Sequence, residues 1–429
     1  MGARHRPGGT TLAPGVFLVA ALASAAACAG SGPAPATSTI PATSAAAPRA
    51  ADGVLTIGVL LPTAGAASTT ARGLRNGIEL AVAQINRDGG VLGQWIQVRT
   101  ADEGAEPAAT SLALDELLAA GADAIIGPLS ARVAPLVAER STNAGVVVCH
   151  PASAAGARSP RPRGTVVTTM PTIAASGRAL GRVLVETGAR RVAVIAPADD
   201  YGVEIAGGVT AELRSQGIES RSTLYDARAP VPAEVAARTT TTDRPDAVAV
   251  VGNVEPGARV LDGLFAAGLR PPGVPVVVSE GFRQQELLDV FGSDTALDGV
   301  SLLLPQADAT GTTFRDVVAA ADPTLTRTWS YAAYGYDCVS LLAVAAEAAR
   351  SDDPAVFGPR IVDSSRAGVS CTTVKRCGEL TAEGRNIDLV GASGPLDLDD
   401  AGNPTDARFE LHRFDSGGRT RLLRVFSLR

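Results

Sequence analysis

Polar side chains that suit the capture of a small charged molecule follow several apolar runs of this 429-residue chain. Glu280 comes directly after the run Val274–Ser279, and a single carboxylate at such a place suits an ammonium group. Tyr201 follows another apolar run, and its ring suits an apolar side chain. Ser130 ends the turn Gly127-Pro-Leu-Ser130, where we expect it to cap a helix whose N-terminus suits a carboxylate. These residue types indicate a site for a small ligand.

The sequence lacks the motifs of the common enzymes. It has no Gly-x-Ser-x-Gly elbow, no phosphate loop ending in Gly-Lys-Ser/Thr and no cluster of metal ligands. The only histidines are His5, His150 and His412. So few histidines argue against a Ser-His hydrolase, and none lies near the cysteines at the spacing of a zinc site. The adjacent acids Asp199 and Asp200 point apart in an extended segment, and their alternative role is that of solvated charges. We expect a protein that is not an enzyme and that uses no cofactor and no metal.

Composition excludes two further classes of protein. The net charge of −6 argues against nucleic acid as a partner, because phosphate binding needs a basic face. Mean hydropathy is +0.17, yet no stretch after residue 30 reaches the ~18–20 continuous apolar residues that a membrane span needs. The length suits two domains of ~150–200 residues each.

The N-terminus is typical of an exported protein. Arg4-His-Arg6 is followed by the apolar stretch Val16–Ala23 and then by small residues up to Cys28. This order resembles a lipoprotein signal, so we expect a signal peptide over 1–28 and lipidation of Cys28, with an ordinary cleaved signal as the alternative. Residues 29–52 are mostly Ala, Pro, Ser and Thr, which predicts a flexible tether because so few apolar groups cannot offset the entropy of ordering.

Export makes disulfides possible for the four remaining cysteines. Cys371 and Cys377 are close in sequence, and we expect a local disulfide between them rather than a zinc site. Cys149 and Cys338 lie in apolar contexts, which favours buried free thiols. A bridge between these two is the alternative.

Short β-rich runs alternate with amphipathic stretches from residue 54 onward. Leu74, Ile78, Ala81 and Ile85 form a helical stripe over 72–88, for example. The expected strands are 54–61, 96–101, 122–126, 145–149, 191–196, 218–225, 246–251 and 274–279. The expected helices are 72–88, 107–120, 131–143, 176–187, 202–216, 257–268 and 328–350. This alternation predicts an α/β protein with two doubly wound lobes and a ligand cleft between them, beyond the carboxyl ends of the strands. The last 45 residues indicate antiparallel strands.

Several short motifs occur in the order found in the leucine/isoleucine/valine-binding protein family. They are Gly127–Ser130, Pro151-Ala-Ser153, Asp199–Gly202, Glu280-Gly-Phe282, Tyr331–Asp337 and the tail from Cys371 through Gly391–Asp399. Their shared order carries the resemblance, which covers residues 54 to 415. It implies the type I periplasmic-binding fold, in which three crossovers form a hinge between the lobes. The implied division is 53–170 plus 308–368 for the first lobe and 171–307 plus 369–429 for the second.

The resemblance also implies a function and a set of ligand contacts. Ser130 and the segment Ala152, Ser153 and Ala154 would meet a ligand carboxylate, whereas Tyr201 and Glu280 would come from the second lobe, Glu280 facing the amino group. Members of the family usually carry Ser and Thr where His150 and Ala154 stand. The lost Thr hydroxyl puts a standard branched-chain ligand in doubt, unless Ser153 or His150 replaces it.

The implied activity is that of an extracytoplasmic solute-binding lipoprotein. It would bind a branched-chain or other amino acid, or a related amide, by lobe closure. It would then deliver this ligand to the membrane permease of an ABC importer while a lipid on Cys28 holds it at the membrane. The alternative is an extracellular sensor of the same fold that signals to a membrane partner.

Overall fold

The computed structural model describes most of the chain after the first fifty residues: 51–65, 67–151, 162–226, 232–282, 284–291, 295–307, 312–321, 323 and 329–428. The expected signal peptide 1–28, Cys28 and nearly all of the expected tether 29–52 lie outside these residues. Ala152, Ser153 and Ala154 also lie outside them.

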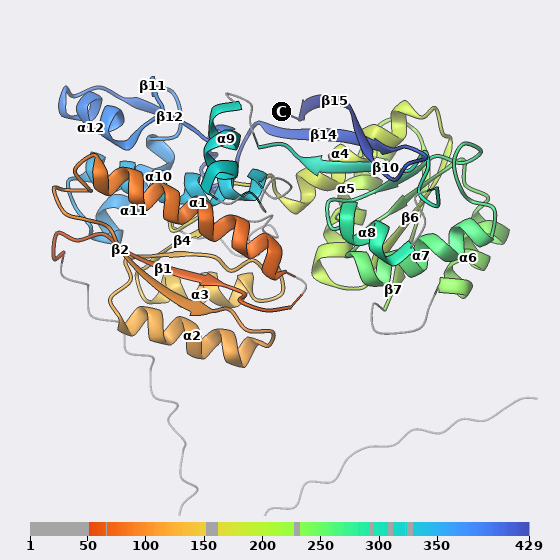
Figure 1. Ribbon diagram of the computed structural model, residues 1–429, viewed down its shortest axis with the longest axis horizontal. Helices are drawn as coiled ribbons and strands as arrows, with labels where there is room; N and C mark the ends of the chain where they lie inside the picture. Colours follow the sequence, from red (N-terminus) through yellow and green to blue (C-terminus); the bar gives the residue numbers. More distant parts are fainter. Residues whose placement is uncertain are drawn as a thin grey trace, which may run out of the picture. The chain divides into compact units, whose positions relative to one another are not determined.

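A five-stranded parallel sheet in the order β2-β1-β3-β4-β5 forms the centre of the first lobe. Its strands are β1 (Thr56–Leu61), β2 (Gln97–Asp102), β3 (Ala124–Ile126), β4 (Val147–His150) and β5 (Val166–Thr168). Helices α1 (Ser68–Arg87) and α10 (Trp329–Ala349) cover one face, and α2 (Pro107–Ala119) and α3 (Ala134–Asn143) cover the other (Figure 1). Side chains of β1 alternate between the two layers: Ile57 and Val59 enter the α1 side, whereas Leu60 enters the α2 side.

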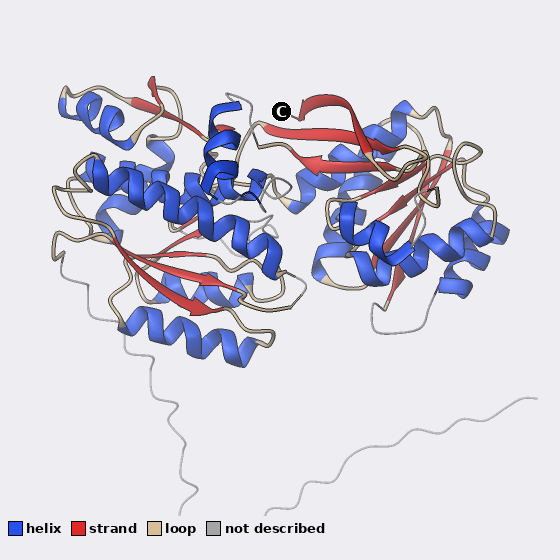
Figure 2. Ribbon diagram, viewed as in Figure 1, coloured by secondary structure: helices blue, strands red, loops and turns tan. Residues whose placement is uncertain are grey.

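A seven-stranded sheet in the order β15-β14-β10-β9-β8-β6-β7 forms the centre of the second lobe. The parallel strands are β6 (Arg191–Pro197), β7 (Glu219–Tyr225), β8 (Ala247–Val250), β9 (Val276–Val278) and β10 (Ser301–Pro305), and the antiparallel ones are β14 (Ala407–Phe414) and β15 (Thr420–Leu428). Helices α4 (Ile173–Glu186) and α5 (Asp200–Ser215) pack on one face. Helices α6 (Pro232–Arg238), α7 (Val254–Ala266) and α8 (Gln284–Phe291) pack on the other, and a π-helical turn, η1 (Thr239–Asp243), follows α6. Figure 2 shows this sheet between its two helical layers.

The strands and helices predicted up to β9 are confirmed, whereas β5, α6 and η1 were not predicted. Four helices begin two to four residues earlier than expected: α1, α4, α5 and α7. Helix α1 begins at Ser68 rather than at 72. Helix α4 begins at Ile173 rather than at 176, since the Thr172 hydroxyl accepts a hydrogen bond from the N–H of Ala175 at 3.2 Å and caps the helix.

The chain passes between the lobes three times: after β5, after β10 and before β14. Helices α9 (Thr312–Ala321) and α11 (Pro354–Asp363) belong to the first lobe, since Val318 packs against Ala332 of α10 and Phe357 lies in the core beneath it. None of the helices in the described ranges is long and apolar enough to cross a membrane.

The expected division of the tail between the lobes is wrong for its first part. Residues 369–398 form β11 (Val369–Cys371), α12 (Val374–Ala382), β12 (Ile387–Gly391) and β13 (Gly394–Pro395), a three-stranded sheet with one helix. Their apolar side chains join the core of the first lobe, as Leu380, Leu389 and Leu396 show. Only β14 and β15 enter the second sheet. The sequence pattern indicated turns and strands only for the last 45 residues; it did not predict α12, and it carried no sign of which core this segment would meet.

A buried carboxylate attaches this segment to α10. Asp337 is fully buried, and its oxygens accept hydrogen bonds from the N–H groups of Ala392 (2.6 Å) and Ser393 (2.8 Å) and from the Ser393 hydroxyl (2.5 Å). Burial raises the pKa of Asp337 to about 7, although the three donors oppose that rise. Gly391 allows the close approach, because a Cβ there would lie 2.4 Å from the Asp337 Oδ1.

Two disulfides lie in the first lobe. Cys149 of β4 is bonded to Cys338 of α10, 189 residues away, with their Cα atoms 5.8 Å apart. The preference for free thiols at these two residues is therefore wrong, because the helix that crosses the sheet brings the two cysteines together. Cys371 of β11 is bonded to Cys377 of α12, six residues away, with a Cα separation of 5.4 Å.

The two disulfides should differ in their contribution to stability. A crosslink that closes a long loop restricts the unfolded chain more than one that closes a short loop, by ~5 kcal/mol against ~2 kcal/mol in the chain-entropy account. We expect the pair C149A/C338A to lower the free energy of unfolding by more than C371A/C377A does. Denaturant unfolding of both double variants beside the wild type measures the difference, and equal losses would contradict it.

Candidate functional site

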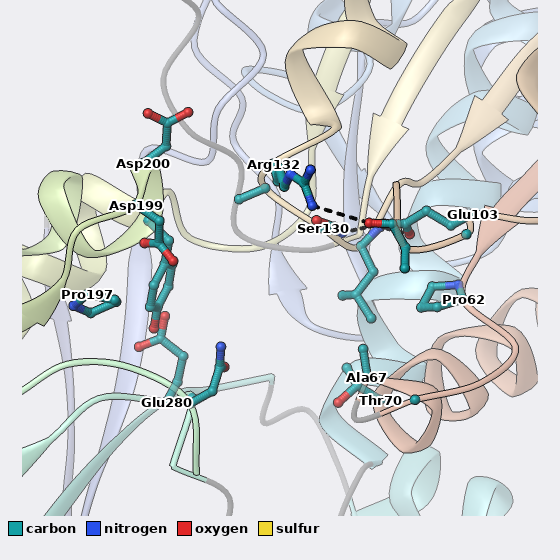
Figure 3. A pocket seen from close by; sticks show the side chains of 18 of the residues that line it. Pro62, Ala67, Thr70, Glu103, Ser130, Arg132, Pro197, Asp199, Asp200 and Glu280 are labelled. Carbon is teal, nitrogen blue, oxygen red and sulfur yellow. Dashed lines mark hydrogen bonds between the residues drawn. The ribbon is translucent and has the colours of Figure 1, made fainter. Parts of the chain in front are cut away.

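A cavity of about 1280 Å3 lies where the carboxyl ends of strands from both sheets meet. All of its walls belong to one compact unit of the chain, Ala45–Arg429. The loops after β1, β2 and β3 supply the first-lobe wall, and the loops after β6, β7, β8 and β9 supply the second-lobe wall. Figure 3 shows Glu103, Ser130 and Thr70 on one side and Asp199 and Glu280 on the other. The cavity is therefore at the place that the strand-end rule predicts.

Glu103, the residue after β2, organises the first-lobe wall. Its side chain is only 1% exposed. Oε2 accepts a hydrogen bond from the N–H of Leu129 at 2.7 Å, and Oε1 accepts one from the N–H of Ser130 at 2.9 Å. Burial raises the pKa of Glu103, and the two N–H bonds oppose the rise. The sequence analysis missed this residue, although its place directly after an expected strand could have revealed it.

The turn that supplies these donors runs close over β1. Gly127 has a φ of +124°, and a Cβ there would lie 2.1 Å from the carbonyl oxygen of Leu60. Only glycine fits such a place. The turn is consequently held from below by β1 and from the side by Glu103.

Ser130 lines the cavity, but it is not the cap of α3. A short turn separates it from the helix, and its carbonyl oxygen accepts from the N–H groups of Val133 and Ala134. Helix α3 begins at Ala134, and its N-cap Val133 makes no side-chain cap. The expected N-cap role of Ser130 is therefore wrong.

Asp102 holds a second loop of the same wall. It accepts hydrogen bonds from the Thr63 hydroxyl (2.5 Å), the Gly104 N–H (3.1 Å) and the Thr63 N–H (3.2 Å). The Thr63 hydroxyl bond is the largest cause that lowers the pKa of Asp102 below its usual value. In the hydroxyl-rich loop after β1, the N–H and hydroxyl of Thr63 are thus already bonded to a carboxylate of the protein.

The second-lobe wall brings together Tyr201, Glu280 and Asp199, all of which line the cavity. Asp199 caps α5, because its Oδ1 accepts a hydrogen bond from the Gly202 N–H at 2.8 Å. The Tyr201 hydroxyl lies 3.4 Å from the Ser279 hydroxyl. Burial, followed by the Glu280 charge, raises the pKa of Tyr201 well above its usual value, so Tyr201 keeps its proton.

The carboxylate of Glu280 is buried and lacks one hydrogen bond within the described residues. It is 8% exposed, and its Oε1 has no hydrogen-bond partner within the described part of the chain. Burial raises the pKa of Glu280, while its own N–H and the Tyr201 hydroxyl oppose that rise. An acceptor in such a place costs stability until a donor reaches it.

His150 lies at the end of β4 but does not line the cavity. It is 3% exposed, and its carbonyl oxygen accepts from the Thr168 hydroxyl (3.0 Å) and the Thr169 N–H (3.1 Å). Two further residues line the cavity: Met170, which the sequence analysis did not name, and Tyr331, which begins one of the motifs of the resemblance but was not expected at the site.

Negative charge dominates the cavity wall. Six of its residues are acidic: Asp102, Glu103, Asp199, Asp200, Asp226 and Glu280. Arg132 is the single cation among the described lining residues, and it forms an ion pair with Glu106 at 2.7 Å. No group of three His, Cys, Asp or Glu side chains in the described ranges is arranged to hold a metal ion.

Comparisons with known proteins agree with this geometry. The family profile described as "Periplasmic binding protein" matches residues 54–361. The Leu/Ile/Val-binding protein BraC3 of Rhizobium johnstonii is 26% identical over 390 residues, which cover 89% of this chain and 96% of that protein.

Solved structures share the fold. The leucine-binding protein LivK of Thermotoga maritima superimposes with a TM-score of 0.71 at 18% identity, covering 87% of this chain and 98% of that one. LivJ of Streptococcus pneumoniae in complex with isoleucine gives 0.68 at 18% identity, with 87% and 99% covered. A solute-binding protein of R. palustris in complex with benzoate gives 0.63 at 20% identity, with 87% and 96% covered. These similarities confirm the expected type I periplasmic-binding fold. The chain therefore belongs to the periplasmic binding protein family, and its expected similarity to the Leu/Ile/Val-binding proteins is confirmed.

Proposed function

We propose that this protein is an extracytoplasmic solute-binding lipoprotein of an ABC importer. It captures a small polar ligand that carries an amino group, an amino acid or a related amide, and delivers it to a membrane permease without chemical change. In this proposal residues 1–28 form the signal peptide, a lipid on Cys28 anchors the protein, and 29–52 are the tether.

The observation that carries the proposal is the buried carboxylate of Glu280. An ammonium group at the cavity would donate to the unpaired Oε1 and would neutralise a charge that the surroundings do not balance. Tyr201 lies beside it with an aromatic ring for the apolar part of the ligand. Ser130 and the segment Ala152–Ala154 complete the set of proposed ligand contacts.

The ligands named for the relatives support a small organic molecule and do not fix its identity. LivK is described as a leucine-binding protein, and LivJ was solved with isoleucine. The R. palustris protein was solved with benzoate, which has no amino group. The choice among such classes depends on the cavity of this chain.

A thermal-shift screen of the purified protein tests the proposal. The compounds are amino acids, short amides, polyamines, sugars and aromatic acids. A ligand at one hundred times its dissociation constant stabilises the folded state by ~2.7 kcal/mol, which appears as a clear rise in melting temperature. We expect a rise with compounds that carry an amino group. A rise with none of these compounds would contradict the proposal.

Glu280 should cost the unliganded protein stability while it strengthens binding. Its pKa is raised in the folded state, so that state holds the Glu280 proton to higher pH than the unfolded state does, and the contribution of Glu280 to stability falls as pH rises above the unfolded value near ~4.3. Glu280→Gln removes this loss. The melting temperature of the variant minus that of the wild type should therefore increase from pH 4 to pH 8. Its affinity for an amine ligand should drop at least tenfold, ~1.4 kcal/mol.

Glu219→Gln is the matched control, because Glu219 is an exposed carboxylate of the same lobe. It should change neither the pH dependence nor the affinity. If the melting temperatures of Glu280→Gln and wild type differed by a constant amount across this pH range, and their affinities were equal, Glu280 would be removed from the proposed site.

Ligand binding should draw the lobes together. Contacts from both walls exist at once only when the lobes close, so the ligand favours the closed state by its differential affinity. We expect a smaller radius of gyration by small-angle X-ray scattering when the tightest compound of the screen is present. Superimposable profiles with and without that compound would rule out closure.

A further inference from the structure

Two backbone donors at which a ligand carboxylate could bind on the first-lobe wall are already occupied by the protein itself. The N–H groups of Leu129 and Ser130 both point to the Glu103 carboxylate, at 2.7 and 2.9 Å. These are the donors of the turn in which the family resemblance places the carboxylate of the ligand. Glu103 is only 1% exposed, so its carboxylate is part of the wall and not a mobile surface group.

The neighbouring donors are used in the same way. Thr63, after β1, gives its N–H and its hydroxyl to Asp102, and Gly202, at the start of α5, gives its N–H to Asp199. A carboxylate that entered the cavity would have to displace these acids or lie against them, and like charges in a partly buried site repel strongly. Two lining helix N-termini in the described ranges have no side-chain cap, that of α1 at Ala67 and that of α7 at Asn253, and beside so many acids they suit an uncharged oxygen.

The second-lobe wall shows the opposite need. Glu280 is 8% exposed and lines the cavity, and one of its oxygens has no hydrogen-bond partner within the described residues. The only cation among the described lining residues, Arg132, is already paired with Glu106. Among the described lining residues, the cavity therefore favours positive charge at the second-lobe wall and has no unpaired cationic side chain for a carboxylate at the first.

We propose that Glu103 is a specificity-determining residue, which closes the 129–130 turn to ligand carboxylates, so that the cavity takes cationic amines without a free carboxylate. Amino amides and simple amines are the class that fits. This inference rests on the proposed function. It narrows the proposed ligand from amino acids in general to amides and amines that lack the carboxylate.

Matched pairs of compounds test the inference. Each pair keeps the side chain and changes only the carboxylate: leucine with leucinamide and 3-methylbutylamine, alanine with alaninamide, phenylalanine with phenylalaninamide, and lysine with 1,5-diaminopentane. Isothermal titration and thermal shift on the full secreted protein give the affinity ratio within each pair. We expect the amide or amine to bind at least tenfold tighter than its amino acid.

The variant Glu103→Gln reports on the proposed cause. It removes the charge and frees one N–H of the turn, so the amino acid should gain at least tenfold in affinity relative to its amide. Glu116→Gln, an exposed acid of α2 in the same lobe that does not line the cavity, is the matched control and should leave the ratio unchanged. The wild-type ratio is measured without any variant, so a folding defect in Glu103→Gln does not protect the inference.

The outcomes separate this inference from the proposed function. Tighter binding of the amino acids, or of benzoate and other acids, by the wild type would overturn the inference and leave a solute-binding protein. A preference for amides that Glu103→Gln does not reduce would remove Glu103 as its cause and overturn the inference in that form. Binding of none of the screened compounds would overturn both.

Discussion

Burial of the parallel strands on both faces is the constraint on which the rest of this structure depends. Strands β3, β8 and β9 have no exposed residue, because helices cover both sides of each sheet. Charged groups are consequently excluded from the strand interiors and gather where the strands end. Since parallel strands end at the same edge, the acids that follow β2, β6 and β9 meet in one cavity although up to about 180 residues separate them in sequence.

Two buried carboxylates show how differently such groups are used. Asp337 has three donors, two backbone N–H groups and a hydroxyl, and it joins α10 to the segment after β12. Glu280 is buried to a similar degree, yet one of its oxygens has no partner among the described residues. A carboxylate whose donors come from the protein fixes the fold, whereas one with an unpaired oxygen in a cavity can be completed by a ligand. Asp406 also keeps a buried oxygen without a hydrogen-bond partner in the described ranges, but it does not line the cavity, whereas Glu280 does.

The sequence predicts the sheets and the cavity wall well, since both follow from local patterns. Apolar runs mark the strands, and Ser130, Tyr201 and Glu280 were found because each follows one of them. The strand before Glu103 has the mixed pattern Gln-Val-Arg-Thr-Ala-Asp, as expected for the edge position of β2, so its end drew less notice. The donors that Glu103 binds lie 26 and 27 residues away, and no local pattern reports such a pairing.

Other features missed by sequence reasoning depend on partners still farther away. Cys149 meets Cys338 across 189 residues, and the 369–398 segment meets the first-lobe core through Asp337, 55 residues before Ala392. Local propensity indicated strands and turns in that tail, which is right for β14 and β15. The choice between the two cores is a tertiary decision, made by the buried carboxylate and by the apolar side chains of α12 and β12.

The acids of the first-lobe wall have two effects that cannot be separated. Asp102 and Glu103 hold the loops after β1 and β3 in place by accepting their N–H groups, and the same two charges set the electrostatic character of the cavity. A rigid wall lowers the entropy that a ligand must overcome on binding. A change of specificity toward carboxylates at Glu103 would therefore also release the turn that Ser130 ends. Selectivity and preorganisation on this wall are consequently coupled, whereas Glu280 on the opposite wall keeps one oxygen, Oε1, that has no partner within the described residues and can be matched to the ligand.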